Sequence, residues 1–160
     1  MVNHPEDIIP MCLEAGADII SFHPETANNK IFRLLNQIKD ACKKCGLVLN
    51  PATPAESIAE YAHLLDKATV MSVDPGYAGQ KFIPESLNKI RKLINMRKNN
   101  GYHYLTEIDG SCNEKTFGQI AESGVDVFIV GTSGLFSLHE DVSQAWDRMI
   151  EIFQRETVAA

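Results

Sequence analysis

Two short apolar runs, residues 105–108 and 127–130, each end in a glycine followed by small hydroxyl residues. An apolar run that ends in Gly and then Ser or Thr predicts a strand whose C-terminal end opens into a tight loop. The outward-pointing N–H groups of such a loop can bind an anion without a side-chain charge. Asp109, at the end of the first run, places one carboxylate beside these two loops. The pattern predicts a site for a phosphorylated substrate, formed by Asp109, Gly110, Ser111, Gly131, Thr132 and Ser133.

The elements that would position these residues alternate between strand and helix. We expect strands at 18–23, 46–49, 69–73, 105–108 and 127–130, and helices at 5–15, 27–43, 55–65, 85–97, 114–123 and 142–154. Pro5 begins the first helix and Gly16 ends it. Near-continuous apolar strands, each followed by a helix, predict a parallel sheet with both faces covered.

Polar residues or glycine stand at the C-terminal end of every expected strand, at His23, Asn50, Asp74, Asp109 and Gly131. In a (β/α)8 barrel this end is the active-site face, and the last two strands commonly hold phosphate. No Gly-x-Gly-x-x-Gly follows the first strand, which disfavours a dinucleotide-binding fold. The pattern therefore predicts an α/β fold of the TIM (β/α)8 barrel type.

The composition of the 160 residues is that of a globular protein, with 44% hydrophobic and 22% charged residues. A net charge of −6 argues against nucleic-acid binding, and no apolar run is long enough to span a bilayer. Cys42 and Cys45 form one Cys-x-x-Cys without a second pair, so a structural zinc site is disfavoured. We expect reduced cysteines and a cytoplasmic protein.

Five motifs in one order carry a family resemblance: His-Pro-Glu at 23–25, Leu-Asn-Pro-Ala-Thr-Pro at 49–54, Val-Met-Ser-Val-Asp-Pro-Gly-Tyr-Ala-Gly-Gln-Lys-Phe at 70–82, Ile-Asp-Gly-Ser at 108–111 and Val-Gly-Thr-Ser-Gly-Leu-Phe at 130–136. As a set they resemble the ribulose-phosphate 3-epimerase family over residues 1 to about 155. Within that family, Asp-Gly-Ser-Cys-Asn at 109–113 and Gly-Thr-Ser at 131–133 are similar to the D-allulose-6-phosphate 3-epimerases. The ribulose-5-phosphate enzymes usually carry Asp-Gly-Gly and Gly-Ser there.

The resemblance implies that three family strands, bearing a Ser, a His-x-Asp and a His, have no counterpart in this sequence. Residues 1–160 would then be a single domain, the C-terminal five βα units of a partial barrel, N-terminally truncated relative to the family. We expect the strands at 18–23 and 127–130 to be open edges. We also expect the chain to form a homo-oligomer, to bind metal poorly and to be nearly inactive by itself, because three of the four family metal ligands are absent.

The resemblance also assigns roles within the site. Asp109 matches an aspartate that exchanges the proton at the third carbon of the substrate and also binds one divalent metal ion (Zn, Mn, Co, Fe or Mg). Gly76, Tyr77, Ala78 and Gly79 match a loop that closes over the substrate. Gly110, Ser111, Gly131, Thr132 and Ser133 match the phosphate-binding loops.

Simpler interpretations stay open at each position. Asp109 could cap a loop, and the glycines could serve only the turns. Met71 matches a methionine that lines the reacting carbons, or is ordinary core. His23 fits a hydrogen-bonded structural histidine, and we expect Trp146 in the core.

The function predicted from the sequence is metal-dependent 3-epimerisation of a ketose phosphate, D-allulose 6-phosphate to D-fructose 6-phosphate. The alternatives are a D-ribulose-5-phosphate 3-epimerase, a related hexulose-phosphate synthase, and a non-catalytic remnant that binds phosphate or a partner chain.

Overall fold

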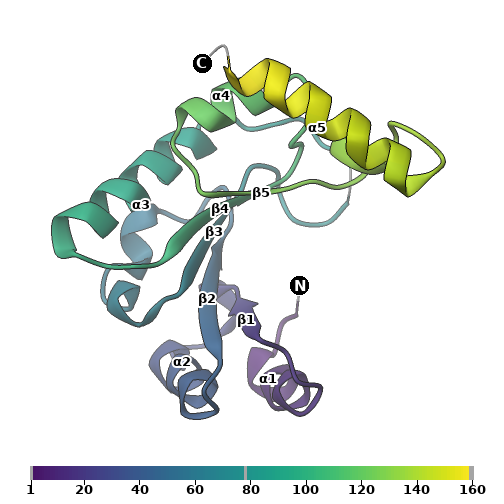
Figure 1. Cartoon of the computed structure of the whole chain (residues 1–160). Coiled ribbons are helices and arrows are strands. Elements are labelled where there is room, and N and C mark those ends of the chain that lie inside the picture. The colour runs from purple at the N-terminus through teal and green to yellow at the C-terminus, as the bar shows by residue number, and fades with distance from the viewer. Residues whose placement is uncertain (1, 78, 159–160) are drawn as a thin grey trace.

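Five strands form one parallel sheet in a computed structural model that describes residues 2–77 and 79–158 (Figure 1). Their order in the sheet follows the sequence: β1 (Ile19–Phe22), β2 (Lys44–Leu49), β3 (Lys67–Met71), β4 (Leu105–Asp109) and β5 (Val127–Ile129). All four pairings are parallel, and β1 and β5 are the two edges. The predicted strand order and edges are confirmed.

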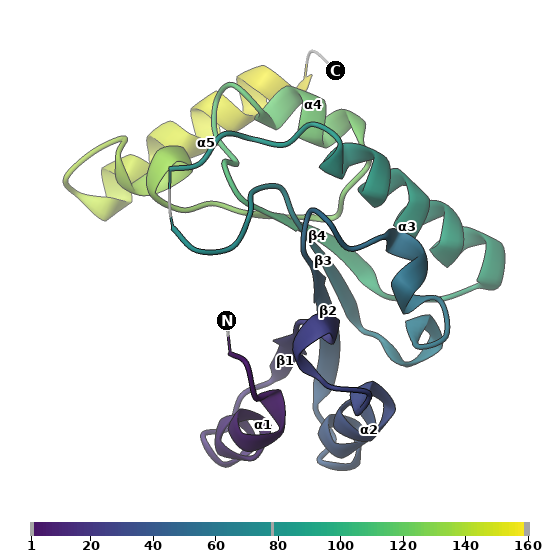
Figure 2. The same ribbon diagram turned by 180° about the vertical axis from the view of Figure 1, so that it is seen from behind.

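The helices lie on the outer side of the curved sheet, and the opposite side is open (Figures 1 and 2). They are α1 (Pro5–Glu14), α2 (Ile31–Asp40), α3 (Ser86–Asn100), α4 (Phe117–Glu122) and α5 (Val142–Val158). Within the described residues, no helix is both long and apolar enough to cross a membrane.

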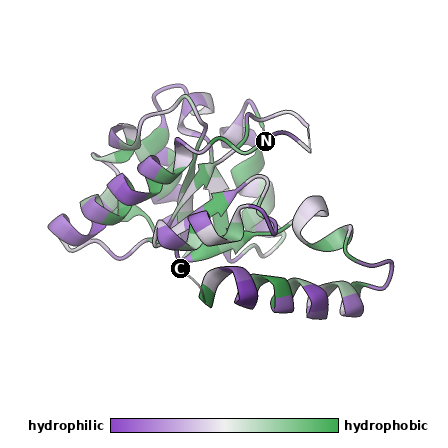
Figure 3. Cartoon of the chain, turned by 90° about the horizontal axis from the view of Figure 1, so that it is seen from above, coloured by the Kyte–Doolittle hydropathy of each residue, from purple (hydrophilic) through white to green (hydrophobic). Residues whose placement is uncertain are grey.

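Alternation along the strands separates the two faces of the sheet. Ala68 and Val70 of β3 and Ile108 of β4 have no exposed surface and lie in the core. Neighbouring residues along a strand point to opposite faces, so Thr69 and Glu107, which pair across β3 and β4, lie on the inner side. Figure 3 shows hydrophobic residues concentrated on the strands, with hydrophobic and hydrophilic segments alternating along the helices. The inner face is therefore polar in places, where uniformly apolar strands were expected.

Two predicted helices differ from the structure. The helix expected at 27–43 spans only Ile31–Asp40, because Asn28 and Asn29 before it adopt left-handed φ values of 45° and 64°, and Cys42 after it adopts one of 56°. Residues 55–65 form two 3-10 turns, Ala55–Ile58 and Ala62–Leu64. The three-residue spacing of Ala55 and Ile58 buries both on one side of such a turn.

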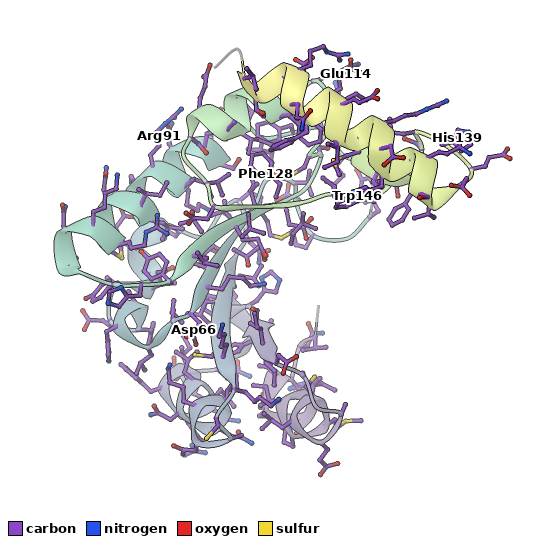
Figure 4. All side chains as sticks on the ribbon, viewed as in Figure 1. Asp66, Arg91, Glu114, Phe128, His139 and Trp146 are labelled. Carbon is purple, nitrogen blue, oxygen red and sulfur yellow. The ribbon has the colours of Figure 1, made fainter. Side chains whose placement is uncertain are left out.

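Two other helices extend further than predicted. α3 continues through polar residues to Asn100 and ends at Gly101, whose φ of 67° is the left-handed C-terminal conformation. α5 continues to Val158. The core placement of Trp146 is wrong, because its exposed fraction is 51%. It lies on the part of α5 that projects past β5 (Figures 1 and 4).

Candidate active site

A cavity of about 680 Å³ lies at the C-terminal ends of β3, β4 and β5. Its walls include all six residues predicted from the two glycine–hydroxyl runs and three from the expected closing loop: Gly76, Tyr77, Gly79, Asp109, Gly110, Ser111, Gly131, Thr132 and Ser133. The fourth loop residue, Ala78, lies outside the described residues. The structure thus brings these nine side by side, as parallel strands with a common end require.

Asp109 is the last residue of β4 and pairs with Met71 on one side and Ile129 on the other. All three residues line the cavity. Burial raises the pKa of the Asp109 carboxyl, the Glu107 carboxylate adds to the rise, and the Lys67 ammonium opposes it. A raised pKa makes the carboxylate a stronger base than an exposed aspartate. Met71, which could have been ordinary core, is half-buried and faces the same space.

A buried ion pair lies next to Asp109, two residues back along the same inner face. Glu107 is 7% exposed. Its Oε1 forms an ion pair with Lys67 Nζ at 2.8 Å and accepts a hydrogen bond from Thr69 Oγ1, also at 2.8 Å. These three side chains come from neighbouring positions of β3 and β4. They lie on the inner face of the sheet beneath the cavity. The Glu107 carboxylate is therefore paired away from the cavity, and Asp109 is the β4 carboxylate that lines it.

The backbone turns sharply after Asp109. Gly110 has a φ of 120°, and a Cβ there would lie 2.7 Å from Cγ2 of Val73. Ser111 follows with a φ of 50°, a left-handed value that few residues other than glycine adopt. The turn redirects the chain into the cavity wall, so a small residue is required at the strand end.

Two polar side chains that were not predicted as site residues connect the loops of the site. Asn113 Nδ2 donates to the Ser111 carbonyl at 3.0 Å and to Ser133 Oγ at 3.3 Å, which links the loops after β4 and β5. Gln80 Nε2 donates to the carbonyls of Asp74 and Tyr77, while the Gln80 carbonyl accepts from Ser111 Oγ. The sequence signal for Asn113 was its place in the turn after β4, because Asn side chains in turns commonly form hydrogen bonds with the nearby backbone.

The turn after β5 packs directly on the loop after β4. Thr132–Phe136 form a short helical turn, and a Cβ on Gly134 would collide with the Cys112 carbonyl. Gly134 therefore permits the close approach of the two loops. The N–H groups of Thr132 and Ser133 open this turn, where helical geometry leaves N–H groups without an intrahelical acceptor.

His23 lies outside this cavity, as expected for a structural histidine. His23 is 7% exposed. Its Nδ1 lies 3.9 Å from a carboxylate oxygen of Glu25 and has no hydrogen-bond partner among the described residues. Glu25 Oε1 accepts from Asn50 Nδ2 at 3.1 Å and from Thr53 Oγ1. The hydrogen bond expected for a structural histidine is thus not found at Nδ1.

The described residues do not by themselves fit a divalent metal ion. No group of three or more His, Cys, Asp or Glu side chains comes together in residues 2–77 and 79–158. The carboxylate adjacent to Asp109 is Glu107, and its Oε1 is occupied by Lys67 and Thr69. The Cys-x-x-Cys also fails as a ligand pair, because Cys45 is fully buried and Cys42 is exposed.

Residues 1–136 match the model of the ribulose-phosphate 3-epimerase family. The chain belongs to this family. It is 41% identical over 136 residues to the ribulose-phosphate 3-epimerase of Buchnera aphidicola, covering 85% of this chain and 59% of the relative. It is 40% identical over 133 residues to that of Escherichia coli K12, covering 83% of this chain and 59% of the relative. The chain thus spans about three fifths of the length of the curated relatives it matches.

The structural likeness extends over nearly the whole chain. The crystal structure of 3-hexulose-6-phosphate synthase from Salmonella typhimurium superposes with a TM-score of 0.61 over 98% of this chain and 70% of that one. At 18% identity this likeness concerns the fold alone. Together with the five parallel strands in order, it confirms a partial barrel of the α/β class.

Proposed function

We propose that this chain carries the phosphate site and one acid/base residue of a ketose-phosphate 3-epimerase that converts D-allulose 6-phosphate to D-fructose 6-phosphate. The supporting observation is that Asp109 shares one cavity with two loops of glycine and hydroxyl residues. Membership of a family whose curated relatives are named ribulose-phosphate 3-epimerase supports the reaction type.

Asp109 would remove or return the proton at the third carbon from one face of the substrate. Its raised pKa favours proton acceptance, and its position as the last residue of β4 places the carboxylate at the cavity. The backbone N–H groups around Ser111 and Thr132 would hold the phosphate, and the loop at 76–79 would cover the sugar. Asp109 would also be one of the ligands of a divalent metal ion, which would supply positive charge to the site.

The proposed substrate rests on the loops that distinguish the two kinds of family member. Asn113 links the loops after β4 and β5 through Ser111 and Ser133, so the Asp-Gly-Ser-Cys-Asn and Gly-Thr-Ser runs act as one unit. D-Ribulose 5-phosphate, one carbon shorter, is the second candidate because the relatives are named for a ribulose phosphate. Comparing kcat/KM for the two sugars distinguishes them, and a preference for ribulose 5-phosphate would reject the allulose assignment.

The test of Asp109 is a chimera in which residues 1–136 replace the matched segment of the Escherichia coli relative. Asp109→Asn should retain the fold and phosphate binding but slow deuterium exchange at the third carbon by at least 100-fold, because an amide is a far weaker base. The control in the same chimera is Asp40→Asn, an exposed change on α2. Normal exchange in Asp109→Asn would refute the role.

The phosphate loops have a separate test in the chain itself. No atom outside the neighbouring residues lies within 4 Å of a Cβ built on Gly131, which lines the cavity, so the side chain of Gly131→Val would enter open space there. We expect this variant to lose inorganic phosphate binding in calorimetry while its circular dichroism spectrum is unchanged. Unaltered phosphate affinity would contradict the assignment of the loops.

A further inference from the structure

The walls of the active-site cavity carry negative but not positive side chains. Among the described residues that line it, Asp74 and Asp109 are carboxylates, and none is Lys, Arg or His. The loops after β4 and β5 offer backbone N–H groups, whose partial charges act over hydrogen-bond distances. The whole chain has a net charge of −6 at pH 7. A phosphate dianion that approaches the cavity is therefore repelled by these side chains before it reaches the N–H groups.

A second hollow lies directly beside this cavity. It is a groove of about 460 Å³, with residues 80–84 on the way to α3 as one wall and residues 111–119 around the start of α4 as the other (Figure 2). Gln80 and Ser111 line both the groove and the cavity. Ser111 Oγ donates a hydrogen bond to the Gln80 carbonyl, so this contact lies at the boundary of the two spaces. The groove and the cavity thus share a wall.

Two unpaired lysines line the groove. Lys81 and Lys115 are exposed, and neither forms an ion pair within residues 2–77 and 79–158. The lysines of the described chain that do form ion pairs are Lys30, Lys39, Lys43, Lys67 and Lys92. Glu114, next to Lys115 in sequence, pairs with Arg155. The groove therefore has two free positive charges beside a cavity whose described walls have none.

The remaining polar side chains of the groove contribute few donors to a ligand. Asn113 Nδ2 and Thr116 Oγ1 both donate to the Ser111 carbonyl, so these donors are already in use. Recognition in the groove thus depends mainly on the charges of Lys81 and Lys115. Ion pairs at exposed positions are weak, so we expect an anion to bind the groove loosely and to exchange rapidly.

We propose that this groove, formed by residues 80–84 and 111–119 and called the lysine groove below, is an outer anion site for the phosphate group of an incoming sugar phosphate. The inference rests on the proposed function, because it takes the ligand of the cavity to be a phosphate ester. Lys81 and Lys115 attract the dianion over a Debye length, about 8 Å at physiological ionic strength, which exceeds the range of an N–H hydrogen bond. A phosphate held in the groove is concentrated next to the inner loops, so these loops fill faster.

Inorganic phosphate titrated into the whole chain tests the groove and the inner loops separately, because amide signals in nuclear magnetic resonance report each region by itself. We expect the signals of residues 81–83 and 115–119 to shift with a Kd roughly tenfold higher than that of residues 131–133, since exposed ion pairs are weak. Calorimetry at concentrations that saturate the inner loops reports mainly the tighter site. Gly131→Val should abolish the shifts at 131–133 and leave those of the groove.

The charges of the groove are removed by Lys81→Met and Lys115→Met together, which nearly preserve side-chain length. This double variant should lose the groove shifts and keep a response at residues 131–133. Phosphate association with the inner loops, from the line shapes of these signals, should slow roughly fivefold at about 0.01 M salt. The slowing should be under about twofold at about 1 M salt, where the Debye length is only about 3 Å. Lys81→Arg with Lys115→Arg keeps both charges and should restore the association rate.

The matched control is Lys44→Met with Lys98→Met. These lysines are also exposed and lie outside the groove, at the start of β2 and in the last turn of α3. The control changes the net charge by the same amount, so it should leave the groove shifts and the association rate unchanged.

Four results would overturn the outer site. They are an absence of groove shifts in the unaltered chain, groove shifts that persist in the methionine double variant, equal slowing in the control, and groove binding without an effect on association at the inner loops. The last result would mean an adventitious ion only. All four leave the response of residues 131–133 intact, whereas a chain in which these residues do not respond to phosphate would reject the proposed function and the capture role together.

Discussion

Replacing Lys67 with methionine should destabilise the chain more than neutralising its partner Glu107. Methionine keeps the length of the side chain but removes the charge, so Glu107 keeps only the hydrogen bond from Thr69. The Glu107 side chain is 9% exposed, and an ionised carboxylate left unpaired at that depth is costly. Removal of one partner from a buried pair typically costs about 3–5 kcal/mol, and we expect about 3 kcal/mol because the Lys67 side chain is 21% exposed and water reaches this end of the pair.

Glu107→Gln should cost less, about 1–2 kcal/mol. The amide oxygen can still accept from Thr69 Oγ1, and the partly exposed Lys67 ammonium can turn toward water. In the double variant no charge is buried, so its cost should fall short of the sum of the two single costs by roughly 1.5–2 kcal/mol.

Urea unfolding followed by circular dichroism measures all three values in one buffer. Lys98→Met, the same change at an exposed position on α3, serves as a surface control and should stay within about 0.5 kcal/mol. Equal costs for Lys67→Met and Glu107→Gln, or strictly additive costs in the double variant, would refute the argument that an uncompensated carboxylate dominates.

Three further predictions concern single positions. Gly110→Ala should cost about 2 kcal/mol in urea unfolding, because φ is 120° and the new Cβ would lie 2.7 Å from a Val73 methyl carbon, whereas Gly131→Ala meets nothing and should cost little. Burial raises the pKa of Tyr104 to about 12 from an ordinary 10.0, so the unfolded chain releases the Tyr104 hydroxyl proton at a lower pH than the folded chain does. Stability should therefore fall as pH rises from about 10 toward 12, and less so in Tyr104→Phe, measured by urea midpoints at several pH values. Burial likewise raises the pKa of Cys112 to about 12, so Ellman's reagent should modify this thiol only on unfolding, and a thiol modified as fast as a free one would contradict its burial.

The candidate site was largely predictable because its signals are local. Gly110 and Gly131 follow apolar runs directly, and the turn chemistry of such a junction depends on residues adjacent in sequence. The five parallel strands followed from the same kind of signal, since strand–helix alternation limits the topology to few choices. The metal expectation for the complete enzyme and the roles carried by the resemblance remain predictions.

The sequence alone determined the order of the strands and the strand ends that carry the site, because side-chain period and glycine placement act within a few residues of the chain. Only the tertiary structure decided that Glu107 meets Lys67, 40 positions earlier, and that Asn113 joins Ser111 to Ser133, because strand register fixes which distant side chains face each other. It also decided the exposure of Trp146. Helical spacing tells which residues share a face of α5, but only the neighbouring elements determine whether that face is covered.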